Sequence, residues 1–361
     1  MSSRERGDLL QSIATTIADY RQGEIPQIDV DHVDKWANQF EAEDQLGILQ
    51  EIDHLLKRYY VSRSKAQSFI RTMITDKKLF GNDPCTTLIR TKFLNIQRKG
   101  SSQQDLLSIL GETIRTEYGL GLEECGEKPS LYIYMDDCLY SGNTARYDLE
   151  AWLPTAQANT KLLSIFFASH TRAVRYVSQK LNPIFARHHM TWQSLRLFGF
   201  YNIPWESRNF DCLWPRQAYG DHLIEDYVQQ MVERNKGMRY PPRCFRPDRV
   251  PLRDSVFSSP ELREALERIF LKAGAYIISL CESPKLEMRP LGYEKLESLG
   301  FGSTFVTYRN IANNSPLALW WGDPTKPPDT PLGKWYPLFP RKTNEPMAAF
   351  EIFIDDDTIA L

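Results

Sequence analysis

Two adjacent aspartates, Asp136 and Asp137, follow an apolar run and precede a short polar loop. Carboxylates accept hydrogen bonds from the hydroxyl groups of a sugar. In the loop, Gly142 permits a tight turn, and the hydroxyl groups and the N–H groups of a helix start attract phosphate. This one segment therefore predicts a ribose 5-phosphate site. Its residues are Asp136 and Asp137 for the ribose and Ser141, Gly142, Asn143 and Thr144 for the phosphate.

The position of the aspartates along the strand decides whether they can act together. Successive side chains of a strand point to opposite faces of the sheet. We expect the strand at 131–135 to end before the pair, so that the chain turns and both carboxylates reach one ligand. A phosphatase-type site is excluded, because that chemistry uses two aspartates separated by one residue, whereas these two are adjacent.

The segment Met135-Asp-Asp-Cys-Leu-Tyr-Ser-Gly-Asn-Thr144 resembles the signature loop of type I phosphoribosyltransferases. Cys138 stands where that signature usually has an aliphatic residue. The resemblance implies that Asp136 and Asp137 orient the ribose and stabilise positive charge at ribose C1. It also implies that Mg²⁺ arrives on the ligand's pyrophosphate and ribose oxygens, without a separate metal site on the protein.

A second loop, 97–102, follows an earlier expected strand and precedes a helix. In the type I family a loop at this place binds pyrophosphate through backbone N–H groups and a basic residue. The resemblance therefore implies that Arg98 and Lys99 offset the charge of pyrophosphate, and that Gly100 holds an unusual backbone conformation.

Strands and helices must alternate to position these loops. The expected strands are 93–96, 131–135, 162–168 and 191–198, and helices are expected between them. One of these helices should begin within a residue or two of Asn143. The alternation predicts an α/β fold with a mostly parallel sheet, which is Rossmann-like and of the type I phosphoribosyltransferase kind.

The flanking regions predict two extensions of this core. Helical spacing before residue 80, with Ser62 as an N-cap, predicts an N-terminal helical region. A long helix at 260–280 and strands at 301–308, 317–321 and 350–354 predict a C-terminal α/β extension. The expected division is 1–80 for the helical region, 81–235 for the phosphoribosyltransferase-like core, and 236–361 for an extension packed on the core.

The composition excludes several classes of protein. The 44 basic and 46 acidic residues give a net charge of −2, which does not point to a polyanionic partner for the whole molecule. The six cysteines include no Cys-x-x-Cys pair, so a structural zinc site is not expected. The charged N-terminus and the lack of a long apolar run predict a soluble, cytoplasmic protein with no membrane segment.

Residues 30–345 resemble a phosphoribosyltransferase-like family of prokaryotic conflict systems. The resemblance is carried by Trp36-Ala-Asn-Gln-Phe40, the Asp136-Asp137 loop, Leu299-Gly-Phe-Gly302, Ile311–Trp320 and Trp335–Arg341. It implies a toxic effector of a bacterial antiviral system, including retron-type systems, that binds a nucleotide or phosphoribosyl pyrophosphate and transfers or hydrolyses at ribose C1. It further implies protein partners from the same locus, including a reverse transcriptase complex.

Several alternatives stay open. The chain could be a catalytically inactive subunit that senses a nucleotide or joins a defence complex, since fold does not decide activity. The proline- and arginine-rich stretch 235–254 is interpreted as a connection between lobes, with nucleic-acid contact through 234–253 as the less favoured interpretation. His170 with Arg172 could touch a base or pyrophosphate, and Trp320, Trp321 and Trp335 could stack on a base, but structural roles are favoured for all of them.

Overall fold

The computed structural model describes residues 3–98, 100–203, 209–237, 242, 244–247, 255–296 and 298–342. The chain begins with helices, as the sequence predicts. They are α1 (Ser3–Thr16), α2 (Val30–Ala37), α3 (Gln45–Tyr59), α4 (Arg63–Thr75), α5 (Lys77–Phe80) and α6 (Pro84–Ile89). Ser62 caps α4 by accepting a hydrogen bond from the Lys65 N–H, which confirms its predicted role.

A four-stranded parallel sheet follows in the order β1-β2-β3-β4. The strands are β1 (Thr91–Phe93), β2 (Leu131–Leu139), β3 (Lys161–His170) and β4 (Thr191–Phe200), and the helices between them are α7 (Ser102–Tyr118), α8 (Asn143–Trp152) and α9 (Thr171–Arg187). The predicted α/β fold is therefore confirmed, and α8 begins at the expected residue.

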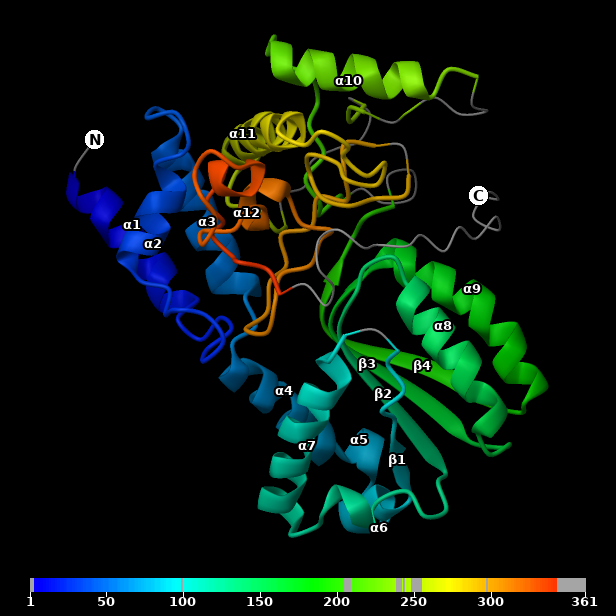
Figure 1. The fold of residues 1–361 in the computed structure, drawn as a ribbon. Helices are drawn as coiled ribbons and strands as arrows, with labels where there is room; N and C mark the ends of the chain where they lie inside the picture. Colours follow the sequence, from blue (N-terminus) through cyan, green and yellow to red (C-terminus); the bar gives the residue numbers. More distant parts are fainter. Residues whose placement is uncertain are drawn as a thin grey trace.

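Helices cover both faces of the sheet (Figure 1). On one face, Ile133 and Met135 of β2 join a core with Leu110 of α7. On the other face, Tyr132 and Tyr134 pack with residues of α8 and α9. The alternation of side chains along β2 thus separates two cores, and it also decides which way each of the later aspartates points.

The first strand was predicted at 93–96, but β1 spans Thr91–Phe93, so the prediction lies a few residues too far along the chain. Leu94 still donates its N–H to the carbonyl oxygen of Ile133. The N–H of Ile96 instead donates to Gln103 Oε1 at 2.8 Å, so the chain leaves the sheet before Ile96. The Gln103 side chain of α7 therefore accepts the hydrogen bond that a neighbouring strand was expected to accept.

The C-terminal part differs from the prediction in its strands. The run 317–321 contains helix α12 (Leu317–Trp320), so the predicted strand there is wrong. A short apolar run does not distinguish a buried helix from a buried strand, and Pro316 precedes this one at its N-cap. Residues 301–308 form isolated bridges, Val61 with Thr307 and Val306 with Ile311, rather than a strand. The predicted strand at 350–354 lies outside the described residues.

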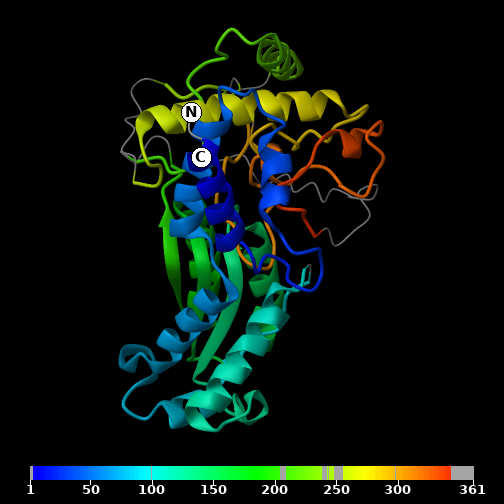
Figure 2. The same ribbon diagram turned by 90° about the vertical axis from the view of Figure 1, so that its left-hand side faces the viewer.

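Between β4 and α12 the described residues form α10 (His222–Arg234) and α11 (Pro260–Ser279). Figures 1 and 2 show α11 and the C-terminal loops on the side of the sheet where the strands end. Most of 234–253 lies outside the described residues, so its predicted linker role stays a prediction.

The N-terminal helices and the C-terminal loops are packed together. The Trp36 Nε1–H of α2 donates to the carbonyl oxygen of Ala318 at 2.9 Å. Val61, just before α4, exchanges backbone hydrogen bonds with Val306 and Tyr308. These contacts hold the loop after Val306 over the carboxyl edge of the sheet. The division of the chain into three regions stays a prediction.

No helix among the described residues is long and apolar enough to cross a bilayer.

Candidate functional site

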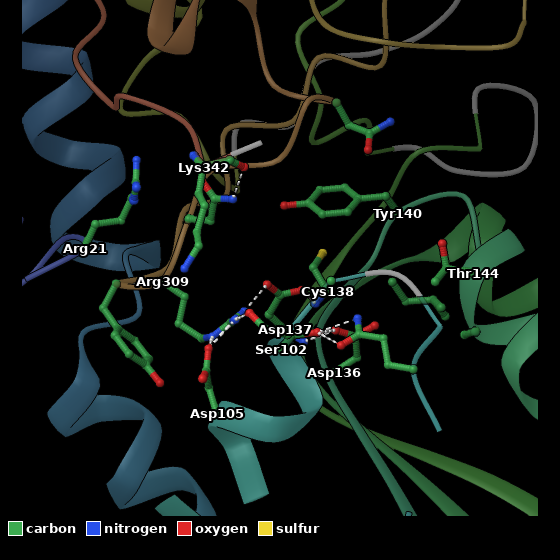
Figure 3. A pocket seen from close by; sticks show the side chains of 18 of the residues that line it. Arg21, Ser102, Asp105, Asp136, Asp137, Cys138, Tyr140, Thr144, Arg309 and Lys342 are labelled. Atoms are coloured by element: carbon green, nitrogen blue, oxygen red, sulfur yellow. Dashed lines mark hydrogen bonds and ion pairs between the residues drawn. The ribbon is translucent and has the colours of Figure 1, made fainter. Parts of the chain in front are cut away.

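A cavity of about 480 Å³ lies at the carboxyl edge of the sheet. Figure 3 shows its lining, in which Thr144 and Arg21 lie on opposite sides with the two aspartates and Tyr140 between them. Side chains from all three parts of the chain contribute: Asp19, Arg21, Glu24 and Arg63 before the sheet, residues of 97–105 and 136–145 in the core, and Tyr308, Arg309, Asn310, Asn314 and Lys342 near the end.

The aspartate pair lies inside β2 and not beyond its end, which corrects the sequence prediction. The strand runs on to Leu139, because Cys138 and Leu139 keep their register with Ala168 and Ser169 of β3. The two carboxylates therefore leave opposite faces of one strand. Both still line the cavity, together with Cys138 and Leu139 from the end of the same strand.

Asp136 is buried and held by neighbouring donors. Ser102, the first residue of α7, donates its hydroxyl to Asp136 Oδ1 at 2.6 Å. The N–H of Asp137 donates to the same oxygen at 2.8 Å, and the Tyr134 hydroxyl lies 3.5 Å from Asp136 Oδ2. Burial and the charge of Asp137 together raise the pKa of Asp136 to about 7, against an ordinary value of 3.8.

Asp136 should therefore make the stability of the protein depend on pH. The folded state binds this proton more tightly than the unfolded state, so the free energy of unfolding falls as the pH rises from about 4 to about 7. We measure the free energy of unfolding in urea for Asp136→Asn and for the unchanged protein. The value for Asp136→Asn, relative to that of the unchanged protein, is expected to rise by about 2–4 kcal/mol between pH 4 and pH 8. Asp329→Asn, at an exposed carboxylate, is the control. If the two proteins differ in the free energy of unfolding by the same amount at every pH, the pKa of Asp136 is not raised.

Asp137 is more accessible and faces a cation. Its side chain is 27% exposed, and its Oδ2 lies 3.3 Å from Nη1 of Arg309. The other oxygen, Oδ1, accepts the N–H of Cys138 at 2.8 Å. The two aspartates are therefore unequal: one is buried in the sheet, and the other is open to a ligand but paired with Arg309.

The loop after β2 matches its predicted place at a helix start. Gly142 is the N-cap of α8 with a φ of +85°, in the left-handed region that favours glycine. A Cβ there would lie 2.7 Å from Cγ2 of Val177, so α9 packs directly against the loop. Ser141, Gly142 and Thr144 line the cavity. Asn143 is not among the lining residues; its N–H lies 3.4 Å from Ser141 Oγ.

The loop between β1 and α7 is held by two glutamines. Gln103 Oε1 accepts the N–H groups of Ile96 and Gln97. Gln97 donates its side-chain amide to Ser102 Oγ at 2.7 Å. These bonds tie the loop to the same serine that holds Asp136, so the loop and the carboxylate form one network.

The predicted pyrophosphate residues have different outcomes. Gly100 lines the cavity and has a φ of +95°, as its expected unusual conformation requires. Arg98 is not among the lining residues, and its N–H points to Asp148 Oδ1 of α8 at 3.4 Å. Lys99 lies outside the described residues.

Sequence reasoning missed several residues of the cavity, and Arg309 above all. Arg309 lies 172 positions after Asp137, so no local spacing links the two. Arg21 and Lys342 lie near opposite ends of the chain and reach the same cavity; both contact Glu24. Ser102 lay inside the predicted loop, and its place before a leucine-rich helix was a usable signal.

His170 and the tryptophans have structural positions. His170 is buried between the rings of Tyr140 and Phe200, each with its centroid 5.3 Å away. Burial lowers its pKa to about 3, so the imidazole is neutral. Trp320, Trp321 and Trp335 are also buried. The favoured structural readings of these residues fit the structure.

The family model PRTase-CE matches residues 33–341 of the chain. This range includes the whole sheet, both loops and Arg309. No curated protein and no solved structure matches the chain.

Proposed function

The chain belongs to the PRTase-CE family, which is phosphoribosyltransferase-like, and from that premise we propose that it binds a ligand containing ribose 5-phosphate in this cavity. The observation that carries the proposal is that the two aspartates line one cavity together with Ser141, Gly142 and Thr144. Ribose hydroxyls would contact the carboxylates, and the 5-phosphate would contact the N–H groups at the start of α8.

In this proposal the chemistry takes place at ribose C1. Cleavage of a bond at that carbon passes through an oxocarbenium-like state, whose positive charge the Asp137 carboxylate would stabilise. Asp136 would orient the ribose from the other face of the strand. Ser102 and Gln97 would keep Asp136 and the neighbouring loop in place, through the contacts described above.

We propose that the cavity takes Mg²⁺ together with the ligand. Asp137 and Asp105 are partly exposed there. Magnesium is usually held by one or two carboxylates together with phosphate oxygens of a substrate. The metal would be held by the phosphate and ribose oxygens of the ligand, as the family resemblance implies, and it would supply positive charge beside a phosphate group on ribose C1.

The alternative is a subunit that binds a nucleotide without catalysis. Two adjacent carboxylates that line one cavity support a ligand site over a scaffold, because the buried Asp136, whose pKa is raised by burial and by the charge of Asp137, is costly to keep in a fold. A ligand or metal would offset this cost. The same observation fits a sensor, so catalysis itself has to be measured.

The proposed biological role is that of an effector, or an effector subunit, in a bacterial antiviral system. It rests on the family resemblance carried by segments along residues 30–345. In such a role the chain would act on nucleotides and be restrained until infection by proteins of the same locus, including a reverse transcriptase in a retron-type system. The helical N-terminal region would then be one surface for these partners.

Calorimetry with a ligand series tests the binding site. We expect the purified chain to bind ribose 5-phosphate, and to bind ribose at least about tenfold more weakly, because charge-assisted hydrogen bonds contribute about 1.5–3 kcal/mol. Equal affinity for both, or no binding, would refute the phosphate site. Release of pyrophosphate from phosphoribosyl pyrophosphate, with Mg²⁺ present, would separate an enzyme from a sensor.

A further inference from the structure

One stretch of the chain has a charge of its own. Residues 151–203 contain six lysines and arginines and no aspartate or glutamate, although acidic residues outnumber basic ones in the whole chain. This stretch forms β3, α9 and β4. Figure 1 shows α9 beside α8 on one face of the sheet, so the outer side of α9 belongs to the surface of the molecule. A weakly acidic protein therefore has one locally basic surface.

The cations of this surface reach solvent without carboxylate partners. Lys180 and Arg187 lie two turns apart on α9 and therefore on the same side of the helix. Arg187 is exposed, as is the pair His188–His189 that follows it, and Lys180 is partly exposed. Within the described ranges, neither Lys180 nor Arg187 forms an ion pair. Exposed Lys161 begins β3 in register with the first residue of β4, so it adds a cation at the end of the sheet where α9 ends.

Two tyrosines lie at the other end of the same surface. The Arg146 guanidinium of α8 lies 5.0 Å from the ring centroid of Tyr147 and 5.9 Å from that of Tyr176, which precedes Lys180 by one turn of α9. Tyr147 is 39% exposed. The carboxylate of Glu150 on α8 is paired with Arg146 at 2.9 Å. Cations for phosphates beside exposed rings for bases are the combination that binds single-stranded nucleic acid.

The surface begins next to the candidate site. A Cβ at Gly142 would lie 3.3 Å from Cδ1 of Tyr176, so α9 starts beside the loop that lines the cavity. From Tyr176 to Arg187 the helix rises about 16 Å. Aliphatic side chains that could enter a bilayer are exposed on other parts of the described chain, namely Ile89, Leu223, Val232, Leu286 and Leu296. A nucleic-acid strand therefore suits this surface better than a membrane does.

We propose that the outer side of α8 and α9 binds single-stranded nucleic acid. Lys161, Lys180 and Arg187 would contact phosphates, and the ring of Tyr147 would stack on a base. The inference goes beyond the proposed function, because this surface lies outside the cavity and binding there needs no ribose 5-phosphate. A bound strand would reach the loop that contains Gly142.

Fluorescence anisotropy with a labelled oligothymidine of about 20 nucleotides tests the surface. The variant Lys180→Gln with Arg187→Gln is compared with Lys77→Gln with Lys78→Gln, which removes the same charge from exposed positions of α5. At about 50 mM salt we expect the α9 variant to bind about ten- to a hundredfold more weakly. Its plot of log affinity against log salt should also be shallower by about 1.4, since each phosphate contact contributes about 0.7. The α5 variant should stay within about threefold of the unchanged chain.

The ring has a test of its own. We expect Tyr147→Ala to weaken binding of the same strand by about tenfold, because stacking on a base contributes about 1–3 kcal/mol. The salt dependence should stay as in the unchanged chain, since no phosphate contact is lost. A duplex of the same length should bind more weakly than the single strand, because its bases are not free to stack.

Several results would overturn the inference. They are no binding by the unchanged chain at low salt, an equal loss in the α5 and α9 variants, and equally tight binding of the duplex, of polyglutamate or of anionic lipid vesicles. If thermal unfolding shows that the α9 variant does not fold, Lys161→Gln decides, with an expected slope change of about 0.7. Binding of the strand without binding of ribose 5-phosphate would uphold this inference and refute the proposed function.

Discussion

The double variant Gly142→Asp with Thr144→Val is expected to lower the affinity for ribose 5-phosphate by at least about a hundredfold. Gly142 has a φ of +85° and a Cβ there would lie 2.7 Å from Val177, so any side chain strains the loop. The aspartate also brings negative charge to the start of α8, where phosphate should bind. Thr144→Val removes a hydroxyl donor. Calorimetry measures the loss.

A matched variant separates this effect from general damage. Gly119→Asp with Thr116→Val makes the same changes at the end of α7. There the glycine has a φ of +69° with open space around it, and the threonine is exposed. We expect this control to unfold at a lower temperature than the unchanged chain but to bind ribose 5-phosphate normally. If both double variants bind alike, the loop after β2 is not the phosphate site.

The loop after β2 was predictable because its signal is local. A strand, two acidic residues, a glycine and the start of a helix lie within ten positions, and each has a physical reason to stand there. The parallel sheet was predictable for the same reason, since apolar runs alternate with helical spacing. Gly142 and the first residue of α8 lie where the sequence placed them.

The rest of the cavity depends on contacts between distant residues. Arg309 reaches Asp137 because Val61 bonds to Val306 and Tyr308, and this pairing holds the C-terminal loop over the sheet. No periodicity in the sequence reveals a backbone pairing between residues so far apart in the chain. The strand predicted at 317–321 was wrong for a related reason: an apolar run shows that the segment is buried but not in which conformation.

The two aspartates also differ more than their adjacency suggests. A strand that continues through Leu139 sends Asp136 toward Ser102 and Asp137 toward Arg309. Asp136 loses water, and its charge is therefore unfavourable, while Asp137 remains partly exposed. If the site is catalytic, the accessible carboxylate is the one that should face the developing charge at ribose C1. Asp136 would then position the ribose.

If the chain has the proposed antiviral role, replacing both aspartates in its native locus should have the largest biological effect. We expect Asp136→Ala with Asp137→Ala to remove protection against phage completely, so that plating equals that of a strain without the locus. The variant loses both groups that would hold the ribose. It also removes the hydrogen bonds that Asp136 accepts from Ser102 and from the N–H of Asp137, so thermal unfolding of the purified variant checks that it still folds. Plaque counts after phage challenge measure the outcome.

Two comparisons make this result interpretable. Asp226→Ala with Asp329→Ala removes two exposed carboxylates away from the cavity and should leave protection unchanged. Affinity purification from the same cells shows whether the double variant still assembles with the partners that the proposed role implies. Lost protection with intact assembly would mean that the ribose site acts in defence. Full protection by the Asp136→Ala/Asp137→Ala chain would instead leave only the interaction-subunit reading, because the carboxylates would then be dispensable.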